Sequence, residues 1–366
     1  MIALYRKYRP QTLEDLLGQD EVVSVLKQAA IKDRFGHGYL FYGPRGTGKT
    51  STARIVAKLA NCVKRKEDAA FAKKGVPCNE CVSCTNIERG VGLDVMELDA
   101  ASNRGIDDIR DLQEHIKTLP SSSSYKVIIV DEVHMLTPQA FNALLKTLEE
   151  PPAHVIFILA TTEYEKLPAT IISRTQQFHF VRPSLQHIVK KLKHIANEER
   201  IAIAPDAIEL IAYSADGSMR DAESLLDQLA SLQEEITVAT IERILGKAAF
   251  SRTIEMAGYC IEGDIEKALT MLYQFYADGY NLFQFTKDLT VYLRRALALS
   301  LTPSLLELFS NELTQAELSA IEQHAKKVDS KKVSMLLKSL ISAYSQMRYN
   351  PIPIVPLEVA IITSLQ

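Results

Sequence analysis

The fold is decided by the stretch Gly43-Pro44-Arg45-Gly46-Thr47-Gly48-Lys49-Thr50. It matches the pattern G-x-x-x-x-G-K-[S/T] and lies between an apolar run typical of a strand and a periodic run typical of a helix. Glycines in this pattern let successive backbone N–H groups face a phosphate, and the start of the helix adds the positive end of its dipole. We therefore expect these residues, together with Ser51, to bind the phosphates of a nucleotide.

A pair of acidic residues supplies the second half of such a site. Asp131 and Glu132 follow the run Val127–Val130, which has no polar face and so predicts a strand buried on both sides. We expect Lys49 to neutralise the β- and γ-phosphates of ATP, Thr50 and Asp131 to hold Mg²⁺, and Glu132 to polarise the attacking water. The alternative is a solvated acidic turn, and the apolar run before the pair argues against it.

Short β-type runs alternate with helical patterns between residues 39 and 180. This alternation indicates an α/β domain in which helices cover a mostly parallel sheet. The clearest strands are Tyr39–Tyr42, Leu93–Leu98, Val127–Val130, Val155–Ala160 and Gln177–Phe180. After the third of these, Thr137 and Pro138 are typical of a helix start, and apolar residues then recur at helical spacing as far as Pro151-Pro152.

The strand signals stop after Pro183, and the rest of the chain has a helical pattern. Residues 181–245 predict a small lid of three or four short helices, interrupted at Gly217-Ser218. Residues 246–366 predict a third, all-helical domain with amphipathic stretches, broken near Asp278-Gly279 and by a proline cluster that begins at Pro351. With the α/β domain at 1–180, the sequence predicts three domains.

The composition excludes several classes of protein. Lysine and arginine number 42 and aspartate and glutamate 45, so the net charge of -3 predicts neither a polyanion binder nor a protein of the membrane surface. Any contact with nucleic acid must then be local. The start of the chain is polar and basic, and no run of about 18 apolar residues follows, so we expect a soluble, cytoplasmic protein that does not bind a membrane.

Four of the five cysteines are crowded together, at Cys62, Cys78, Cys81 and Cys84. In a reducing compartment, two short C-x-x-C steps and a fourth thiol favour one metal ion over disulfides. Zinc is the favoured ion, an iron–sulfur cluster and metal-free thiols are the alternatives, and four protein ligands leave no open position for catalysis. Cys260 stands alone among apolar residues and is expected in a core.

Three further segments narrow the class of ATPase. They are Leu159-Ala160-Thr161-Thr162-Glu163, Ile172-Ser173-Arg174-Thr175 and Gly217-Ser218-Met219-Arg220-Asp221-Ala222. In this order they resemble the AAA+ ATPases of the clamp-loader branch.

The resemblance assigns a role to one residue of each segment. It implies that Thr162 senses the γ-phosphate, that Arg220 touches the nucleotide of its own subunit, and that Arg174 is an arginine finger that reaches the ATP of a neighbouring subunit. The family usually has Ser-Arg-Cys where this sequence has Ser173-Arg174-Thr175, a departure that keeps the arginine. Without the other motifs, Arg174 and Arg220 would be interpreted as solvated surface charges.

Three further features carry the resemblance: the cysteine insertion, Asp131-Glu132-Val133-His134-Met135 and the run from Asn142 to Pro152. With them the resemblance runs from Tyr5 to the C-terminus. It is to the bacterial γ/τ family of DNA polymerase III clamp loaders. The family implies an ATP-driven motor with structural zinc that acts within the polymerase complex. Its implied partners are δ and δ′ subunits, further γ/τ copies, the β sliding clamp and primed DNA.

Contacts with DNA are expected at the phosphate backbone. Arg104 follows the second predicted strand, in a loop that faces the duplex in the family, and is the best candidate; a solvated arginine, or one paired with Asp107 or Asp108, is the alternative. The segment from Tyr5 to Arg9 resembles an aromatic and basic nucleic-acid patch, but the family implies that it packs near the adenine. His134 is expected to be a packed or hydrogen-bonded residue.

Two other functions are kept as alternatives. The first is another DNA-associated AAA+ ATPase, such as a helicase or a branch-migration motor, which would hydrolyse ATP on DNA without any clamp. The second is a scaffold subunit that does not hydrolyse ATP, against which the intact Lys49, Thr50, Asp131 and Glu132 argue.

Overall fold

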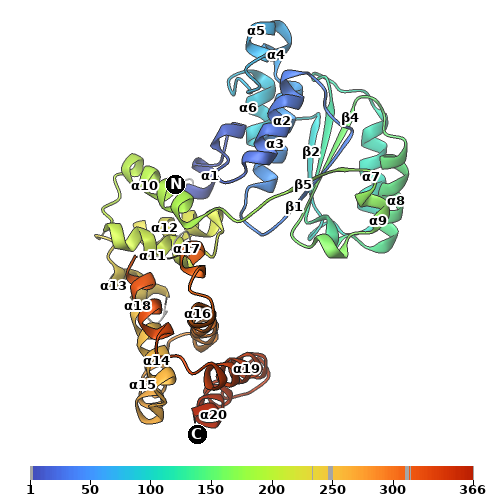
Figure 1. The fold of residues 1–366 in the computed structure, drawn as a ribbon. Helices are drawn as coiled ribbons and strands as arrows, with labels where there is room; N and C mark the ends of the chain where they lie inside the picture. Colours follow the sequence, from blue (N-terminus) through green and yellow to red (C-terminus); the bar gives the residue numbers. More distant parts are fainter. Residues whose placement is uncertain (1–2, 233, 246–249, 310–312, 314, 366) are drawn as a thin grey trace. The chain divides into compact units, whose positions relative to one another are not determined.

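The computed structural model describes residues 3–232, 234–245, 250–309, 313 and 315–365. The chain forms two compact units (Figure 1). The first contains Met1–Lys191 and Ala215–Asp227, and the second contains Leu192–Ser214 and Gln228–Gln366. The predicted boundary between residues 245 and 246 adjoins residues 246–249, which lie outside the described residues.

A parallel five-stranded sheet forms the centre of the first unit, in the order β2-β3-β4-β1-β5. Its strands are β1 (Gly38–Tyr42), β2 (Val95–Asp99), β3 (Lys126–Asp131), β4 (Val155–Thr161) and β5 (Gln176–His179). Leu40 of β1 pairs with Leu159 of β4, and Val130 of β3 pairs with the same Leu159. The carboxyl ends of the three central strands therefore meet at one edge, which is where ligands bind in open parallel sheets.

Helices cover both faces of this sheet, as the sequence predicts. In Figure 1, α2 (Asp20–Ile31) and α3 (Lys49–Asn61) lie on one face, and α7 (Ile106–Lys117) and α8 (Pro138–Glu149) lie on the other. Each face has its own apolar core. Every residue of β4 is buried, because its side chains alternate between the two cores.

The helix α8 begins as predicted. The hydroxyl of Thr137 accepts a hydrogen bond from the backbone N–H of Ala140, and Pro138 occupies the first turn. The remaining short helices of the sheet-containing unit are α1 (Leu4–Lys7), η1 (Leu13–Asp15), α4 (Val63–Glu67), α5 (Ala69–Ala72), α6 (Val82–Arg89), η2 (Val133–Met135), η3 (Tyr164–Lys166) and α9 (Ala169–Ile172).

The second strand differs from the prediction, because it begins at Val95 and not at Leu93. Leu93 is 78% exposed. The carboxylate of Asp94 accepts hydrogen bonds from the backbone N–H groups of the serine loop at Ser121, Ser122 and Ser123. The side chain of Asp94 is fixed by these hydrogen bonds to the serine loop, and the regular strand starts after it.

Four helices follow the sheet: α10 (Leu185–Glu199), α11 (Pro205–Ser214), α12 (Met219–Ala230) and α13 (Val238–Leu245). The predicted interruption is present between α11 and α12, where Gly217 has a φ of 78°, a conformation that favours glycine. The beginning of α12 belongs to the same compact unit as the sheet.

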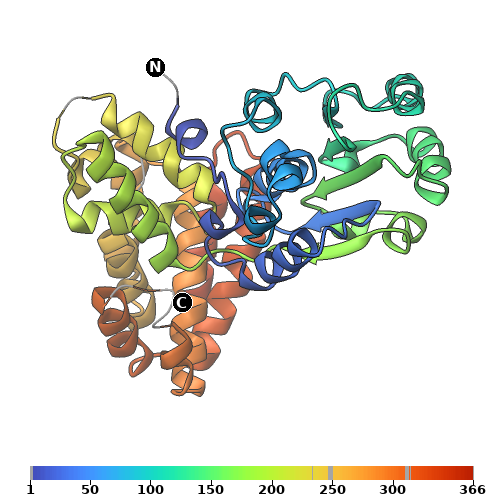
Figure 2. The ribbon, with the colours of Figure 1, turned by 90° about the horizontal axis from the view of Figure 1, so that it is seen from above.

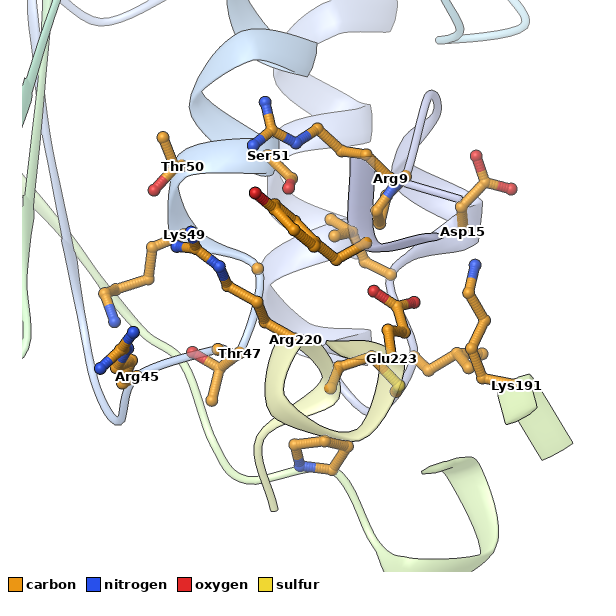
Figure 3. Close-up of a pocket in the computed structure, with 18 of the residues that line it drawn as sticks. Arg9, Asp15, Arg45, Thr47, Lys49, Thr50, Ser51, Lys191, Arg220 and Glu223 are labelled. Atoms are coloured by element: carbon orange, nitrogen blue, oxygen red, sulfur yellow. The ribbon is translucent and has the colours of Figure 1, made fainter. Parts of the chain in front are cut away.

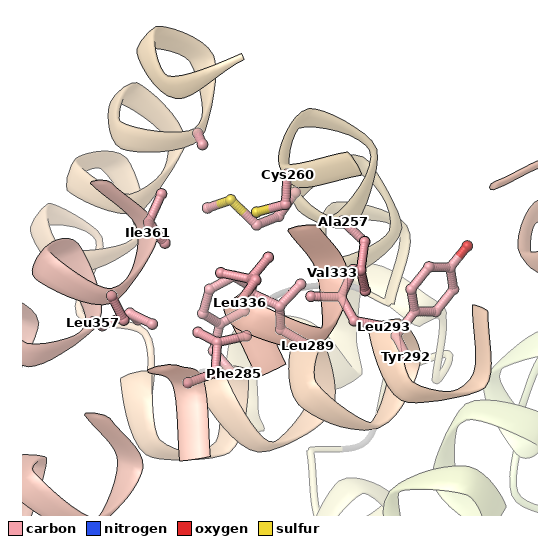
Figure 4. Close-up of a cluster of buried hydrophobic side chains, with 14 of the residues drawn as sticks. Ala257, Cys260, Phe285, Leu289, Tyr292, Leu293, Val333, Leu336, Leu357 and Ile361 are labelled. Carbon is pink, nitrogen blue, oxygen red and sulfur yellow. The ribbon is translucent and has the colours of Figure 1, made fainter. Parts of the chain in front are cut away.

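The C-terminal helices are α14 (Phe250–Glu262), α15 (Ile265–Ala277), α16 (Leu282–Leu301), α17 (Leu305–Phe309), α18 (Gln315–Ala325), α19 (Ser330–Met347) and α20 (Ile354–Leu365). The orange and red helices of Figure 2 lie side by side, and α19 packs against both α16 and α20. Figure 4 shows their apolar core, which includes Leu289, Leu336 and Ile361. Cys260 is buried in this core, as predicted.

The predicted breaks in this region are also present, at the end of α15 and between α19 and α20. Each new helix after a break needs partners for its first backbone N–H groups. The side chains of Asn281 and Asp329 supply them at the starts of α16 and α19. Among the described residues, no helix is both long and apolar enough to cross a lipid bilayer.

Adjacent residues of α19 provide a test of this core. Leu340 is fully buried, whereas its neighbour Ile341 is 59% exposed. We expect Leu340→Ala to lower the free energy of unfolding by about 2–5 kcal/mol, because it removes buried methyl groups and leaves a cavity. Ile341→Ala should change it by less than about 1 kcal/mol. Urea unfolding of the full chain followed by circular dichroism measures both, and equal losses would contradict the packing.

Candidate nucleotide-binding site and cysteine cluster

The predicted phosphate loop joins β1 to α3. Gly48 caps the start of α3 with a φ of 102°, which leaves the first N–H groups of the helix facing the loop. Lys49 is buried, and its ammonium donates hydrogen bonds to the carbonyl oxygens of Gly43 and Pro44, each at 2.8 Å. The lysine is therefore held at the loop by groups that a phosphate oxygen can replace as acceptors.

The loop also makes a close contact with the start of α12. A Cβ atom on Gly46 would lie 2.0 Å from the hydroxyl oxygen of Ser218, so only glycine fits at this position. The backbone N–H of Met219 donates to the carbonyl oxygen of Gly46 at 3.2 Å. This contact places the first turn of α12, which carries Arg220, beside the phosphate loop.

The predicted acidic pair meets the loop at the end of β3. The hydroxyl of Thr50 donates a hydrogen bond of 2.7 Å to a carboxylate oxygen of Asp131. A hydroxyl and a carboxylate side by side are the hard oxygen ligands that Mg²⁺ takes beside a nucleotide, so these two residues fit the role predicted for them.

Glu132 has an unusual backbone and a specific partner. Its φ of 48° is uncommon for a residue other than glycine and costs of order 1–3 kcal/mol, which marks it as a residue held for a purpose. One oxygen of its carboxylate accepts hydrogen bonds from the hydroxyl of Thr162 at 2.9 Å and from its backbone N–H at 3.2 Å. The predicted water-polarising residue and the predicted sensor are thus joined.

His134 packs behind this pair. Its side chain is only 6% exposed, and its Nδ1 lies 2.9 Å from the hydroxyl oxygen of Thr161. The carboxylates of Glu132 and Glu163 lie 3.4 and 3.5 Å from its two ring nitrogens. The prediction of a packed, hydrogen-bonded histidine is confirmed.

A pocket opens in front of the loop (Figure 3). It is lined by Tyr5, Arg9, Pro10, Asp15, Leu16, Leu17, Arg45, Gly46, Thr47, Gly48, Lys49, Thr50, Ser51, Asp131, Glu132, Pro183, Lys191, Met219, Arg220 and Glu223. The guanidinium of Arg220 lies 5.0 Å from the centre of the Tyr5 ring, which is a cation–π contact. The N-terminal segment therefore borders the pocket, and its place near the adenine stays a prediction.

Sequence reasoning missed Asp15, Leu16, Leu17, Lys191 and Glu223 among the lining residues. For Glu223 a signal existed, because it lies three residues after Arg220 on a predicted helix and so shares its face. For Lys191 no local signal existed, because it approaches the pocket from α10.

Burial shapes the electrostatics of the pocket. Burial lowers the pKa of Lys49, and the carboxylates of Glu132 and Asp131 act in the opposite direction. Burial raises the pKa of Glu223 to about 7, although Lys191 and Arg9 act to lower it. Glu223 is 5% exposed and differs in this respect from a solvated surface glutamate.

Arg174 lies away from the pocket, between α9 and β5. Its guanidinium forms an ion pair of 2.8 Å with Glu149 and also donates to the backbone oxygen of Thr170 at 2.9 Å. About a third of its side chain is exposed. The structure therefore does not bring Arg174 to the pocket of its own chain, and its action on a neighbouring subunit stays a prediction.

Arg104 is exposed at the turn before α7, and its Nε donates to the backbone oxygen of Met135 at 3.2 Å. Asp107 pairs with Arg110 instead, at 2.9 Å. In the part of the chain that the structure describes, no ion pair forms between Arg104 and an acidic residue, so the alternative of a salt-bridged arginine lacks support. A role in DNA binding stays a prediction.

The four clustered cysteines converge. Their sulfur atoms all lie within 4.8 Å of one another, and those of Cys78 and Cys84 are 3.9 Å apart. Four sulfurs at about 2.3 Å from one tetrahedral zinc ion are separated by about 3.8 Å, so the cluster fits zinc. Cys62 directly follows α3, and Cys81 and Cys84 lie at the start of α6, so secondary structure positions three of the four thiols.

The thiols differ in acidity. Burial raises the pKa of Cys62 and of Cys84. Burial also acts to raise the pKa of Cys78, but hydrogen bonds from the backbone N–H groups of Glu80 and Cys81 bring it down to about 7. A bound metal ion would overcome the unfavourable burial, because it stabilises every thiolate that ligates it.

Comparisons with known proteins cover almost the whole chain. Three protein-family models match it in succession. They are described as DNA polymerase III, delta subunit, at residues 18–184; DNA polymerase III clamp loader subunit, ATPase lid domain, at residues 187–232; and DNA polymerase III subunits gamma and tau domain III, at residues 236–365.

Individual relatives agree with these matches. DNA polymerase III subunit tau of Bacillus subtilis is 40% identical, over 100% of this chain and 63% of the relative, and subunit tau of Escherichia coli is 37% identical, over 95% and 53%. DNA polymerase III subunit gamma of Buchnera aphidicola is 38% identical over 77% of this chain and 74% of the relative. The chain thus spans 63% and 53% of the length of these two tau relatives.

The cysteine cluster can be tested by metal content. We expect the purified chain to hold about one zinc ion, and Cys78→Ser to lose it and to melt at a lower temperature, since a zinc site stabilises the fold that forms it. Cys260→Ser is the matched control, because this thiol is buried far along the chain from the cluster. Elemental analysis decides: full zinc content in a Cys78→Ser, Cys84→Ser double variant would refute the site.

The raised pKa of Glu223 predicts a dependence of stability on pH. Between about pH 4.5, the ordinary value, and about pH 7, the folded chain retains a proton that the unfolded chain releases. Raising the pH through this window should therefore destabilise the fold, by a total of order 3 kcal/mol. Glu223→Gln should flatten this part of the profile. Melting temperatures of both proteins from pH 4.5 to 8 measure the effect, and parallel profiles would contradict it.

Proposed function

Because the chain belongs to the gamma and tau family of DNA polymerase III subunits, we propose that it is an ATP-hydrolysing subunit of a clamp loader, which opens a sliding clamp and places it on primed DNA during replication. The observation that carries the proposal is the hydrogen bond of 2.7 Å between Thr50 of the phosphate loop and Asp131 at the end of β3. It joins the two halves of a nucleotide site in a chain whose relatives are replication proteins.

The binding step follows from the geometry of the loop. The N–H groups at the start of α3 and the ammonium of Lys49 receive the phosphates of ATP, while Thr50 and Asp131 would hold Mg²⁺. When bound, Mg²⁺ offsets the negative charge that develops on the phosphates. Arg220, at the first turn of α12, contributes a further positive charge from the same chain.

The hydrolytic step uses Glu132 and Thr162. The carboxylate of Glu132 is placed to polarise the attacking water, but in this structure it accepts two hydrogen bonds from Thr162. A γ-phosphate bound at the loop would be a second charged acceptor for the hydroxyl of Thr162 and would compete with Glu132 for it. Binding of ATP would thus release Glu132 for its task, which gives Thr162 the role of a sensor.

Arg174 completes the site of an adjacent subunit in this proposal. Its ion pair with Glu149 is partly exposed, and exposed pairs of this kind contribute only about 0–1 kcal/mol. The guanidinium can therefore exchange Glu149 for a phosphate at little cost. A positive charge supplied in trans is worth roughly 10³–10⁵ in rate where it is used, so hydrolysis should require assembly.

The remaining assignments follow the family. The proposed partners are delta and delta-prime subunits, further copies of the gamma or tau type, the beta sliding clamp and primed DNA, whose backbone Arg104 would contact. The cysteine cluster would hold structural zinc, and the protein would act in the bacterial cytoplasm at the replication fork. Residues 1–180, 181–245 and 246–366 would serve as ATPase domain, lid and oligomerising collar.

A DNA helicase or branch-migration motor would hydrolyse ATP on DNA without a clamp, and a scaffold would not hydrolyse it at all. The measured quantity that separates the three is the ATPase rate of the reconstituted assembly on primed DNA, with and without clamp. A faster rate with the clamp supports the clamp loader. An equal rate without the clamp would favour a helicase or branch-migration motor, and no turnover would favour a scaffold.

Substitution of the finger tests assembly-dependent turnover. We expect Arg174→Ala to reduce the ATPase rate of the assembly by at least about 100-fold while the isolated chain binds ATP as before, because the arginine serves the neighbour's site. Arg110→Ala is the matched control, an exposed, ion-paired arginine on α7. Glu132→Gln provides a reference, because this variant should bind ATP but hydrolyse it slowly. The proposal fails if Arg174→Ala hydrolyses ATP as fast as Arg110→Ala.

A further inference from the structure

Glu223 is the acidic residue of the pocket that has no evident task. Four acidic residues line the pocket: Asp15, Asp131, Glu132 and Glu223. The first three accept hydrogen bonds from protein groups, which fix the turn at η1, the end of β3 and the sensor segment. Among the described residues, no donor forms a hydrogen bond with the carboxylate of Glu223.

This arrangement is costly for the folded chain. Glu223 is 5% exposed, and the oxygens of its carboxylate keep only a small contact with solvent; a carboxylate so little hydrated and without hydrogen bonds is destabilising. The two cations that act to lower its pKa, Lys191 and Arg9, form no salt bridge with it in the described part of the chain, and Lys191 donates to the backbone oxygen of Tyr8 at 3.0 Å. Buried, unpartnered polar groups that face a pocket are characteristic of ligand contacts.

The position of Glu223 along α12 indicates which part of a nucleotide it faces. The start of α12 rests on the phosphate loop, through the hydrogen bond from Met219 to Gly46. Glu223 lies three residues beyond Arg220, about 4.5 Å further along the helix axis. Figure 3 shows both side chains on the pocket side of α12, with the Glu223 carboxylate on the side of Lys191.

The charge of Glu223 itself disfavours the phosphates as its ligand, although Lys191 and Arg9 also act on this carboxylate. A carboxylate repels a phosphate, whereas the loop beside Lys49 attracts it. Tyr5, Leu16 and Leu17 also line the pocket, and their apolar surfaces suit a flat base. The nucleoside, which carries hydrogen-bond donors and no charge, is the part of the ligand that fits.

We propose that Glu223 is a specificity-determining residue, whose carboxylate accepts a hydrogen bond from the nucleoside of the bound nucleotide. The donor is either the exocyclic amine of the base or a hydroxyl of the ribose. This inference rests on the proposed function only in requiring that the pocket bind a nucleotide. A site built around such an acceptor rejects a ligand that lacks the donor, since the carboxylate is then left buried without a partner.

The experiment measures the affinity of the full chain for four triphosphates with Mg²⁺ by calorimetry at pH 8. They are ATP, purine riboside triphosphate, which lacks the amine, and the 2′-deoxy and 3′-deoxy forms of ATP. For the wild type we expect one of the three analogues to bind about 10- to 100-fold more weakly than ATP. The analogue affected identifies the donor as base or ribose.

Two variants and a control attribute this preference to Glu223. Glu223→Leu should bind ATP about 10-fold or more weakly and should no longer distinguish ATP from the affected analogue, because the acceptor is gone. Glu223→Gln keeps an acceptor oxygen of similar shape and should show a smaller preference than the wild type. Asp221→Asn is the control, an exposed acid of the same helix outside the pocket lining, and should behave as wild type.

Several results would overturn the inference. The first is a wild type that binds all four ligands with equal affinity. The second is a Glu223→Leu variant that keeps the preference of the wild type. The third is a Glu223→Leu variant that loses affinity equally for all four ligands. If Glu223→Leu does not fold, the inference is overturned by a Glu223→Gln variant whose preference between ATP and the affected analogue equals that of the wild type. A failure of the proposed function is seen separately, as absent ATP binding by the wild type or as wild-type affinity in Lys49→Ala.

Discussion

The hydrogen bond between Thr50 and Asp131 is the contact on which the site depends. Thr50 belongs to the first turn of α3, and Asp131 ends β3, which is separated from β1 by β4. The two residues can meet only if the central strands are parallel and in register, so that their carboxyl ends lie at one edge. The registers of β1 and β3 on Leu159 of β4 provide this alignment. The register of the buried sheet thus decides whether the two halves of the site meet, because a shift by one residue would turn Asp131 to the other face.

The helix α3 connects the nucleotide site with the cysteine cluster. It begins at Lys49 in the loop and ends at Asn61, directly before Cys62, so that about 20 Å of rigid helix separates the two sites. Lys58 in its last turn is almost fully buried and donates to Glu88 of α6 at 2.7 Å and to Asn79, which lies between the cysteines, at 3.2 Å. The insertion is therefore fastened to the ATPase unit by a buried, multiply hydrogen-bonded cation, a contact whose removal would leave charges unpaired.

The sequence was sufficient where function depends on local spacing. The loop from Gly43 to Thr50, the strand that ends at Asp131 and the spacing of the four cysteines are each contained in a short segment, so their geometry follows from local rules. The start of β2 was misplaced, because the tie between Asp94 and the serine loop joins residues 27 positions apart. The partner of Glu132 and the place of Glu223 were not predictable either, because both depend on how distant segments dock on the loop.

The cations of the ATPase unit fall into two groups, and the difference bears on how the protein can respond to its ligand. Lys49 and Lys58 are buried and hydrogen-bonded to several oxygens, so they cannot leave without a large loss of free energy. Arg174 pairs with Glu149 at the surface, and the exposed Arg220 lies over Tyr5. Contacts of these two kinds are worth about 1 kcal/mol or less, so each guanidinium can exchange its present partner for a phosphate at little cost. Lys49 therefore stays in place at the phosphate loop and Lys58 at the cysteine insertion, whereas Arg174 and Arg220 are free to change partners, which is what the proposed coupling of nucleotide state to subunit contacts requires.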